Sequence, residues 1–370
     1  MPTSRPTVPI GDLRRQAGDL RETLLGAIER VIRSGWYILG EEGRAFEKAW
    51  AYECGATEAI GCANGTDAIT LALLALGIEK GDEVVIPALT AVPTATGVIQ
   101  AGARPVLADV DPDTALLTAE TVERVLTART RAIVAVHLYG QSCKMAPLRA
   151  LADRHGLRLI EDAAQAHGAR DGGEPIGTRA DAACFSFYPS KNLGALGDGG
   201  AVVTRSSDLA ERCRRARNYG QRERYNHVEY GINSRLDELQ AAILAAKLPK
   251  LSSWNDRRRW IATQYDAALA GSPLVPVRND QGGGHVYHLY VVQCKAREKA
   301  SDLLRSRGVE TAVHYPRCLA SQPGLASPRG EWRNAEKLAD QILTIPLFPE
   351  LTDDEVERVG DALKAIRDLS

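Results

Sequence analysis

Short apolar runs alternate with helical patterns between residues 59 and 204, and this alternation constrains the fold more than any other feature of the chain. These short β-rich runs lie at residues 84–86, 105–107, 132–136, 157–160, 182–187 and 201–203. Several are apolar at consecutive positions, as strands buried on both faces tend to be. Helical patterns occupy intervening residues 66–76, 119–126 and 146–154. Strands that alternate with helices predict an open, mainly parallel α/β sheet.

The segment before this region predicts a helix, and the segments after it predict a second, smaller unit. Helical periodicity runs over residues 12–32, and another helix begins near residue 236 and runs out toward Ser252 and Ser253. A Pro-, Gly- and Asn-rich stretch follows at residues 272–284. Beyond it we expect strands at 288–293 and 310–314 and helices at 297–306, 332–342 and 352–366. The sequence thus predicts a large α/β domain over residues 1–250, with an N-terminal helical segment, and a small α+β domain over 251–370.

Composition excludes several classes of protein. The 46 basic and 47 acidic side chains give a net charge of -1, which disfavours nucleic-acid binding. The seven cysteines are odd in number and never form C-x-x-C, so neither a disulfide framework nor a structural zinc site is expected. We find no signal-peptide pattern and no apolar run long enough for a membrane helix, so we expect a cytoplasmic protein without membrane contact. Only 5% of residues are aromatic, so the cores must be aliphatic.

A lysine follows one of the predicted strands. Residues 185–194 read FSFYPSKNLG, which places Lys191 in a tight turn after a buried strand. A Schiff-base lysine must be held, partly desolvated and deprotonated, and a stiff loop in this position provides those conditions. Read alone, the segment also fits an ordinary solvated lysine. The glycines that follow do not have the G-x-G-x-x-G spacing of a dinucleotide-binding site.

A carboxylate lies at the end of another predicted strand. Asp162 follows the apolar run at 157–160, and ligands of open α/β sheets bind beyond the carboxyl ends of the strands. A carboxylate there is suited to hold a cationic ring nitrogen. The alternative is that Asp162 caps a following helix.

A third segment opens the helix predicted over 66–76. Asn64, Gly65 and Thr66 precede it, and the free N–H groups of a helix N-terminus bind phosphate. The alternative is a simple N-cap by Asn64 or Thr66. A Schiff-base lysine, a carboxylate for a ring nitrogen and a phosphate-binding helix start are together the three contacts that pyridoxal 5'-phosphate requires.

The sequence that contains these residues resembles the DegT/DnrJ/EryC1/StrS family of pyridoxal-phosphate-dependent sugar aminotransferases over nearly its whole length. The resemblance is carried by residues 34–40, 136–140, 161–168, 185–194, 233–240 and 345–347. These segments are most similar to the members that aminate keto-deoxyhexoses attached to thymidine diphosphate (TDP). The resemblance implies the aspartate-aminotransferase fold (fold type I), with a large mixed or parallel sheet domain and a small C-terminal α+β domain.

The family resemblance also implies roles for single residues. Lys191 would bond the cofactor aldehyde and later carry the proton that moves during amino transfer. Asp162 would pair with the pyridinium nitrogen, and Gln165 would bind the phenolic oxygen. The residues implied for the phosphate are Gly65, Thr66, Ser186 and, from a neighbouring subunit, Asn233. A homodimer with shared active sites follows, and glutamate is the expected amino donor.

Tyr188 bears on the substrate. Members that aminate carbon 4 often have His at this position, whereas several that aminate carbon 3 have Tyr, so the resemblance favours C3 of a TDP-3-keto-6-deoxyhexose. The alternative is C4 of a TDP- or UDP-linked 4-keto-6-deoxyhexose. Further candidates for the nucleotide-sugar pocket are Trp36, Tyr37, Tyr219, His314 and Tyr315. Each of them fits an ordinary half-buried amphipathic residue equally well.

Two positions need separate comment. Ala91 stands where the family commonly has an aromatic that stacks on the cofactor ring, so we expect the few aromatics near the site, Tyr188 foremost, to face substrate. His285 and His288 form an H-x-x-H pair without a third ligand nearby, which favours a satisfied polar role over a metal site, and no metal is expected.

Two other classes of function remain as alternatives. A non-catalytic regulator that binds the cofactor would typically add a DNA-binding module, and the chain has no spare basic segment for one. A nicotinamide-dependent sugar oxidoreductase would require a strand, a Gly-rich turn and a helix near its start, a pattern that the sequence lacks.

Overall fold

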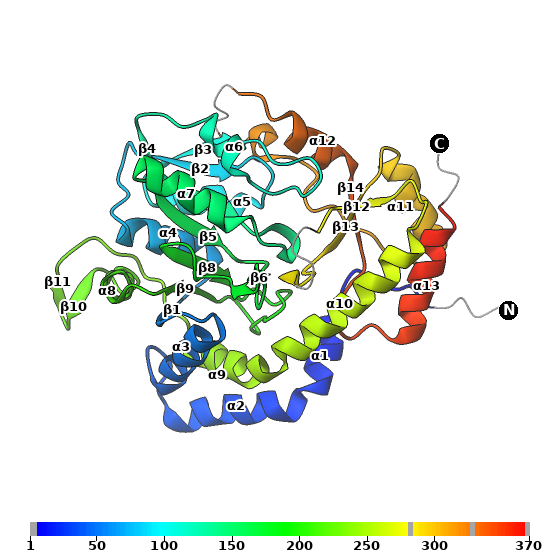
Figure 1. Cartoon of the computed structure of the whole chain (residues 1–370). Coiled ribbons are helices and arrows are strands. Elements are labelled where there is room, and N and C mark those ends of the chain that lie inside the picture. The colour runs from blue at the N-terminus through cyan, green and yellow to red at the C-terminus, as the bar shows by residue number, and fades with distance from the viewer. Residues whose placement is uncertain (1–5, 280–283, 326–329, 367–370) are drawn as a thin grey trace.

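A seven-stranded sheet forms the centre of the computed structural model, which describes residues 6–279, 284–325 and 330–366 (Figure 1). Its strands are β1 (Glu58–Cys62), β2 (Glu83–Pro87), β3 (Arg104–Ala108), β4 (Thr130–Val136), β5 (Arg158–Asp162), β8 (Ala182–Ser186) and β9 (Gly200–Thr204). They lie in the order β1-β9-β8-β5-β4-β2-β3. Strands β8, β5, β4, β2 and β3 are parallel, while β9 is antiparallel to both β8 and β1. The predicted, mainly parallel α/β sheet is confirmed.

Helices connect these strands and cover the sheet. They are α3 (Glu41–Glu53), α4 (Gly65–Ala75), α5 (Val92–Gln100), α6 (Ala119–Glu123), α7 (Met145–His155) and α8 (Ser207–Ala216). A 3-10 turn, η1 (Leu138–Gly140), follows β4. Short hairpins pair β6 (Arg170–Asp171) with β7 (Glu174–Pro175) and β10 (Gln221–Glu223) with β11 (Asn226–His227).

The core of the sheet is aliphatic, as the composition predicts. All five residues of β2 are buried, which is why residues 84–87 read as an apolar run. Four of the scarce aromatics form one cluster, which includes Phe185 of β8. There Phe46, Trp50, Phe185 and Phe187 pack with ring centroids 5.0–6.3 Å apart. Aromatic pairs at this spacing stabilise a core beyond the area they bury.

A long helical path leads from the sheet to the C-terminal part of the chain (Figure 1). It consists of α9 (Glu238–Lys247), the 3-10 turn η2 (Leu248–Lys250) and α10 (Leu251–Ala268). The predicted helix end at Ser252 and Ser253 is wrong, because both lie inside α10. Pro249 causes only a 3-10 turn, because a proline is tolerated at the start of a helix. The division at residue 250 stays a prediction, and residues 280–283 of the predicted linker lie outside the described residues.

The C-terminal part contains a three-stranded antiparallel sheet and three further helices. The strands are β12 (Val275–Pro276), β13 (Tyr290–Gln293) and β14 (Ile342–Ile345), and the helices are α11 (Arg297–Ser306), α12 (Arg333–Gln341) and α13 (Asp353–Lys364). The predicted strand at 310–314 is not formed, since only Ala312 pairs with Thr344 of β14. After that pair the chain turns toward the large sheet, where the hydroxyl of Tyr139 donates to the His314 carbonyl at 2.6 Å.

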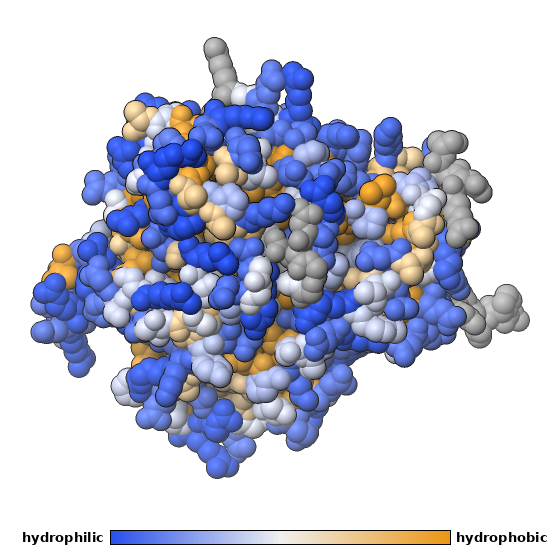
Figure 2. All heavy atoms as spheres, viewed as in Figure 1, coloured by the Kyte–Doolittle hydropathy of each residue, from blue (hydrophilic) through white to orange (hydrophobic). Residues whose placement is uncertain are grey.

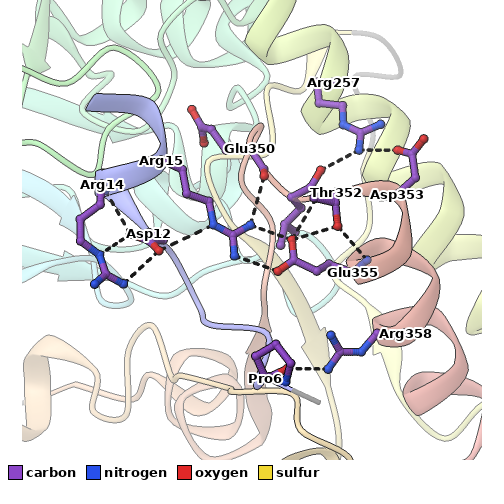
Figure 3. Close-up of polar contacts among 11 residues, drawn as sticks. Pro6, Asp12, Arg14, Arg15, Arg257, Glu350, Thr352, Asp353, Glu355 and Arg358 are labelled. Atoms are coloured by element: carbon purple, nitrogen blue, oxygen red, sulfur yellow. Dashed lines mark hydrogen bonds and ion pairs between the residues drawn. The ribbon is translucent and has the colours of Figure 1, made fainter. Parts of the chain in front are cut away.

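The N-terminal segment packs against this C-terminal part. Two helices, α1 (Leu13–Asp19) and α2 (Arg21–Ser34), replace the single helix predicted over 12–32, with the break at Leu20. Val8 is fully buried and pairs with Val309. Arg15 donates two hydrogen bonds, of 2.7 and 2.8 Å, to Glu355 of α13 (Figure 3). This ion pair lowers the Glu355 pKa to about 2.

The surface seen in Figure 2 is mostly hydrophilic, with small apolar patches. Among the described residues no helix is both long and apolar enough to cross a membrane. All seven cysteines are buried and free.

Candidate active site

A cavity of about 720 Å³ lies at the carboxyl ends of β4, β5 and β8, where the N-terminus of α4 also meets the sheet. Eight of the residues predicted from the sequence line it: Gly65, Thr66, Asp162, Gln165, Ser186, Tyr188, Lys191 and Tyr315. They come from separate strands and loops, because parallel strands bring their carboxyl ends to one edge of a sheet. The structure therefore joins the three predicted cofactor contacts in one cavity.

Lys191 is held in a tight turn at the wall of this cavity. Its backbone N–H donates to the Tyr188 carbonyl at 2.8 Å. A Cβ at Gly194 would overlap the carbonyl oxygen of Pro189, so the turn can close only with glycine there. Burial lowers the pKa of the Lys191 amine to about 8, although the Asp162 carboxylate acts in the opposite direction. Lys191 is thus not a solvated loop lysine.

Asp162 ends β5 and is 6% exposed. The Thr94 hydroxyl donates to its Oδ2 at 2.8 Å, and the backbone N–H of Ala164 donates to its Oδ1 at 3.2 Å. Burial raises the Asp162 pKa, while these bonds and the positive charge of Lys191 oppose the rise. No helix follows directly, so Asp162 is not a helix cap. Its carboxylate is fixed in place and lines the cavity.

The N-terminus of α4 lines the cavity with Gly65 and Thr66. Asn64 caps the helix, because its side chain accepts from the N–H of Asp67 at 2.8 Å. The cap leaves the first N–H groups without partners inside the helix. A Cβ at Gly65 would lie 2.6 Å from the Cβ of Ser186, so glycine is what lets the helix start approach β8 this closely. Capping and phosphate binding are therefore compatible here.

Gln165 links the cavity to the C-terminal part. Its Oε1 accepts from the backbone N–H of Tyr139 at 2.6 Å, and its Nε2 donates to the Tyr315 hydroxyl at 3.1 Å. Burial raises the Tyr315 pKa to about 12, so this hydroxyl stays protonated at neutral pH. An amide nitrogen carries two protons, so Gln165 retains a second donor.

Tyr188 and Ala91 both line the cavity. Tyr188 is 56% exposed and is therefore not packed into the core. Ala91 is the N-cap residue of α5 and places only a methyl group at the wall. The cavity thus has open space where a larger side chain at position 91 would stand.

Five predicted residues lie outside the cavity within the described chain. Trp36, Tyr37 and Tyr219 are 63%, 49% and 45% exposed. Asn233 is exposed. His314 is half-buried and its Nδ1 lies 2.9 Å from the Thr344 hydroxyl. The roles that the family resemblance implies for these residues stay predictions.

Sequence reasoning missed Thr94, which carries the shortest bond to Asp162. A signal was present, since Pro93 fixes the start of α5, which follows β2 after residues 88–91, and places Thr94 in its first turn. Thr90 supports it, with the two hydroxyls 3.0 Å apart. Asp67 and Asp198 also line the cavity without having been predicted.

The H-x-x-H pair forms no metal site among the residues that the structure places. No group of three His, Cys, Asp or Glu side chains gathers there as metal ligands. His285 stacks on Tyr287, with ring centroids 3.9 Å apart, and its Nδ1 accepts from the Tyr287 N–H. His288 lies next to the Lys191 turn, with its Nδ1 3.1 Å from the Oδ1 of Asn192.

The lowered pKa of Lys191 leads to a prediction for how quickly the protein takes up pyridoxal phosphate, the cofactor that the sequence predicts. Only the neutral amine attacks the aldehyde, and an amine with a pKa of about 8 is charged below that pH and neutral above it. We expect the uptake rate to rise about tenfold per pH unit up to pH 8 and then to level off. At pH 7 the neutral fraction should exceed that of an ordinary lysine about 300-fold.

Stopped-flow absorbance across pH 6 to 11 measures this rate, with an N-acetylated lysine amide as the reference amine. A rate that levels off only above pH 10, as the reference should, would show that the environment of Lys191 does not depress its pKa.

Comparison with known proteins identifies the family. The profile of the DegT/DnrJ/EryC1/StrS aminotransferase family matches residues 19–364. The chain is 45% identical over 364 residues to dTDP-3-amino-3,4,6-trideoxy-alpha-D-glucose transaminase of Streptomyces venezuelae. The aligned region covers 97% of this chain and 96% of that relative.

Solved structures agree with the profile. DesV of S. venezuelae, in complex with a ketimine intermediate, superposes with a TM-score of 0.96 at 44% identity, covering 99% of this chain and 100% of that one. NtdA of Bacillus subtilis, with the bound cofactor PMP, superposes with a TM-score of 0.93 at 31% identity, covering 100% of this chain and 87% of that one. PMP is the aminated form of pyridoxal phosphate. The predicted fold type, cofactor and enzyme class are confirmed, and the chain belongs to the DegT/DnrJ/EryC1/StrS aminotransferase family.

Proposed function

We propose that this chain is a pyridoxal-phosphate-dependent aminotransferase that moves an amino group from glutamate onto carbon 3 of a TDP-3-keto-6-deoxyhexose. The observation that carries the proposal is the joint placement of Lys191, Asp162 and the α4 N-terminus around one cavity. The donor set fits the cofactor, with an amine for its aldehyde, a buried carboxylate for its ring nitrogen and free N–H groups for its phosphate.

Lys191 takes up and gives back the proton that moves during amino transfer. When bound, the cofactor supplies a conjugated ring that accepts electrons from the carbon losing its proton. An amine with a pKa of about 8 both takes up and gives back a proton near neutral pH. Asp162, fixed by Thr94 and Ala164, holds the proton of the ring nitrogen in place.

The remaining residues orient the cofactor and the sugar nucleotide. Gly65, Thr66 and Ser186 bind the phosphate, and the spare donor of Gln165 binds the phenolic oxygen. The proposed contacts of the sugar nucleotide are Tyr188, Tyr315, His314, Trp36, Tyr37 and Tyr219. Tyr188 supports carbon 3, because several family members that aminate carbon 3 have Tyr at this position and those that aminate carbon 4 often have His. Its ring lines the cavity.

The name of the S. venezuelae transaminase supports the same substrate class. It places the amino group at position 3 of a TDP-linked trideoxyglucose. We extend the position of amination and the nucleotide to this chain, but not the stereochemistry of the sugar.

The experiment compares four sugar nucleotides under the same conditions. Enzyme with pyridoxal phosphate and ¹⁵N-glutamate is incubated with 3-keto and 4-keto 6-deoxyhexoses, each linked to TDP or UDP, and the new amine is located by NMR. We expect label at carbon 3 of the TDP-linked 3-keto sugar. Label at carbon 4 would favour the alternative substrate. Bound cofactor without any amino transfer from glutamate would favour a non-catalytic regulator.

We also propose a homodimer with shared active sites. Large apolar side chains are exposed on the single chain, among them Trp36, Tyr37, Tyr219 and Tyr230, the last at 75%. Exposed apolar surface of this kind typically marks an interface. In the dimer, Asn233 would reach the cofactor phosphate of the partner subunit. Light scattering should give twice the mass of one chain, and the mass of a single chain in active enzyme would rule the dimer out.

We place the reaction in the cytoplasm. Seven buried, unpaired thiols fit a reducing compartment. Fractionation of the native cells, with activity measured in each fraction, tests this placement, and activity recovered outside the cytoplasmic fraction would contradict it.

A further inference from the structure

The two histidines of the H-x-x-H pair have separate environments, although both are buried. The His285 ring bonds and stacks within its own loop, through Tyr287, while its backbone carbonyl accepts from Arg259 of α10 at 3.3 Å. His288 instead reaches across to the loop that carries Lys191, where its Nδ1 lies 3.1 Å from the Oδ1 of Asn192. The proposed function assigns nothing to either histidine.

Asn192 directly follows Lys191, and both polar atoms of its side-chain amide form hydrogen bonds. It is 2% exposed. Its Nδ2 donates to Oδ1 of Asn255 on α10 at 2.8 Å and to the Val286 carbonyl at 2.9 Å. Its Oδ1 can only accept, so His288 must donate from Nδ1. Every polar atom of the amide is therefore bonded to an element other than its own loop.

The bonds continue away from the cavity. The Nδ2 of Asn255 donates to the His167 carbonyl at 2.9 Å. Asn192, Asn255 and His288 thus form a buried network of uncharged groups behind Lys191. Burial keeps the His288 pKa well below its usual range, and the positive charges of Lys191 and Arg258 act in the same direction. In such a network each lost bond leaves a buried polar atom unpaired.

We propose that Asn192 and His288 form a positioning pair, which fixes the turn after β8 so that the amine of Lys191 is held toward the cofactor. His288 comes from the segment that enters β13, so the pair also ties the small three-stranded sheet to the catalytic turn. Both residues act through Lys191 and do not line the cavity. The inference rests on the proposed role of Lys191.

The test compares three variants of the enzyme loaded with pyridoxal phosphate: His288→Ala, His288→Asn and His285→Ala. Asparagine offers an amide donor at the position of the histidine Nδ1, so it should restore the bond to Asn192. His285→Ala removes an equally buried histidine of the same motif that does not contact the turn. The readouts are the pH midpoint of the bound cofactor's absorbance without substrate, kcat and KM.

For His288→Ala we expect kcat to fall about ten- to a hundredfold with KM within about threefold, because a small misplacement of a reacting group has this cost. Water admitted behind the turn favours the charged form of the lysine–cofactor bond, so the midpoint should rise by about half a pH unit or more. His288→Asn should restore the wild-type kcat and pH midpoint, and His285→Ala should leave kcat and the midpoint unchanged.

If His288→Ala does not fold, Asn192→Ser provides the same test from the other side of the bond. Its hydroxyl is too short to span Asn255 and Val286, and it should shift the midpoint in the same direction. Midpoints and kcat values equal to wild type in these variants would overturn the positioning pair alone. Wild-type enzyme without a borohydride-reducible bond to the cofactor would instead overturn the proposed function, and this inference with it.

Discussion

Replacing Lys191 by alanine should lower amino transfer by at least about 10⁴-fold, because the substitution removes both the covalent attachment of the cofactor and the group that moves the proton. The variant should still bind pyridoxal phosphate, since the α4 N-terminus and Asp162 are unchanged. It should not form a visible-absorbing bond that borohydride reduces, and mass spectrometry of the reduced protein should find no cofactor attached.

Lys247→Met is the matched control for this variant. The amine of Lys247 is also buried, with a pKa lowered to about 8, but it donates to the Gly194 carbonyl and does not line the cavity. This control should still give the reducible bond at Lys191. Cofactor fixed by borohydride in the Lys191→Ala protein would refute the assignment of the nucleophile.

Changing Asp162 to asparagine should lower the turnover rate by about 10³-fold with little change in volume. A carboxylate about 4 Å from a positive ring nitrogen contributes about 4 kcal/mol at an effective dielectric of 20, or about three pKa units. Without that charge the ring nitrogen loses its proton near neutral pH and the ring accepts electrons poorly. Single-turnover kinetics with glutamate measure the loss in the first half of the reaction.

Asp181→Asn serves as the control, because Asp181 stands near the opposite end of β5, where its Oδ2 accepts from the N–H of Leu159 at 2.7 Å. Asparagine keeps a hydrogen-bond acceptor there, so the rate of the half-reaction should stay within about threefold of the wild-type rate. An Asp162→Asn enzyme with a normal half-reaction would mean that another group keeps the ring nitrogen protonated.

Periodicity and position in the chain were sufficient to predict the sheet and most of the cavity. Asp162 and Ser186 end strands, and Lys191 follows one, so the rule that carboxyl ends meet at one edge brings them together. The bond from Thr94 to Asp162 joins residues 68 positions apart. Pro93 indicates where α5 begins, but the pairing itself depends on how the start of α5 lies relative to the end of β5, and no local pattern specifies that.

The wrong predictions share a different cause. Serines such as Ser252 and Ser253 favour helix ends only weakly, and packing of α10 overrides that preference. Residues 310–314 have the composition of a strand, but the His314 carbonyl accepts from the Tyr139 hydroxyl instead of pairing with β14. Backbone pairing is therefore limited to Ala312, although the His314 side chain still reaches Thr344. Trp36 and Asn233 are a different case, because both are exposed on the single chain and their predicted roles require the proposed dimer.

The pairing of Val8 with Val309 has a consequence for the order in which the molecule is made. The partners of this N-terminal segment, including Glu355, are synthesised some three hundred residues later. At about 5–20 residues per second, Val8 leaves the ribosome roughly 15–60 seconds before its binding surface exists. The large sheet has time to form in that interval, whereas the C-terminal core that buries Val8 can close only when translation is nearly finished.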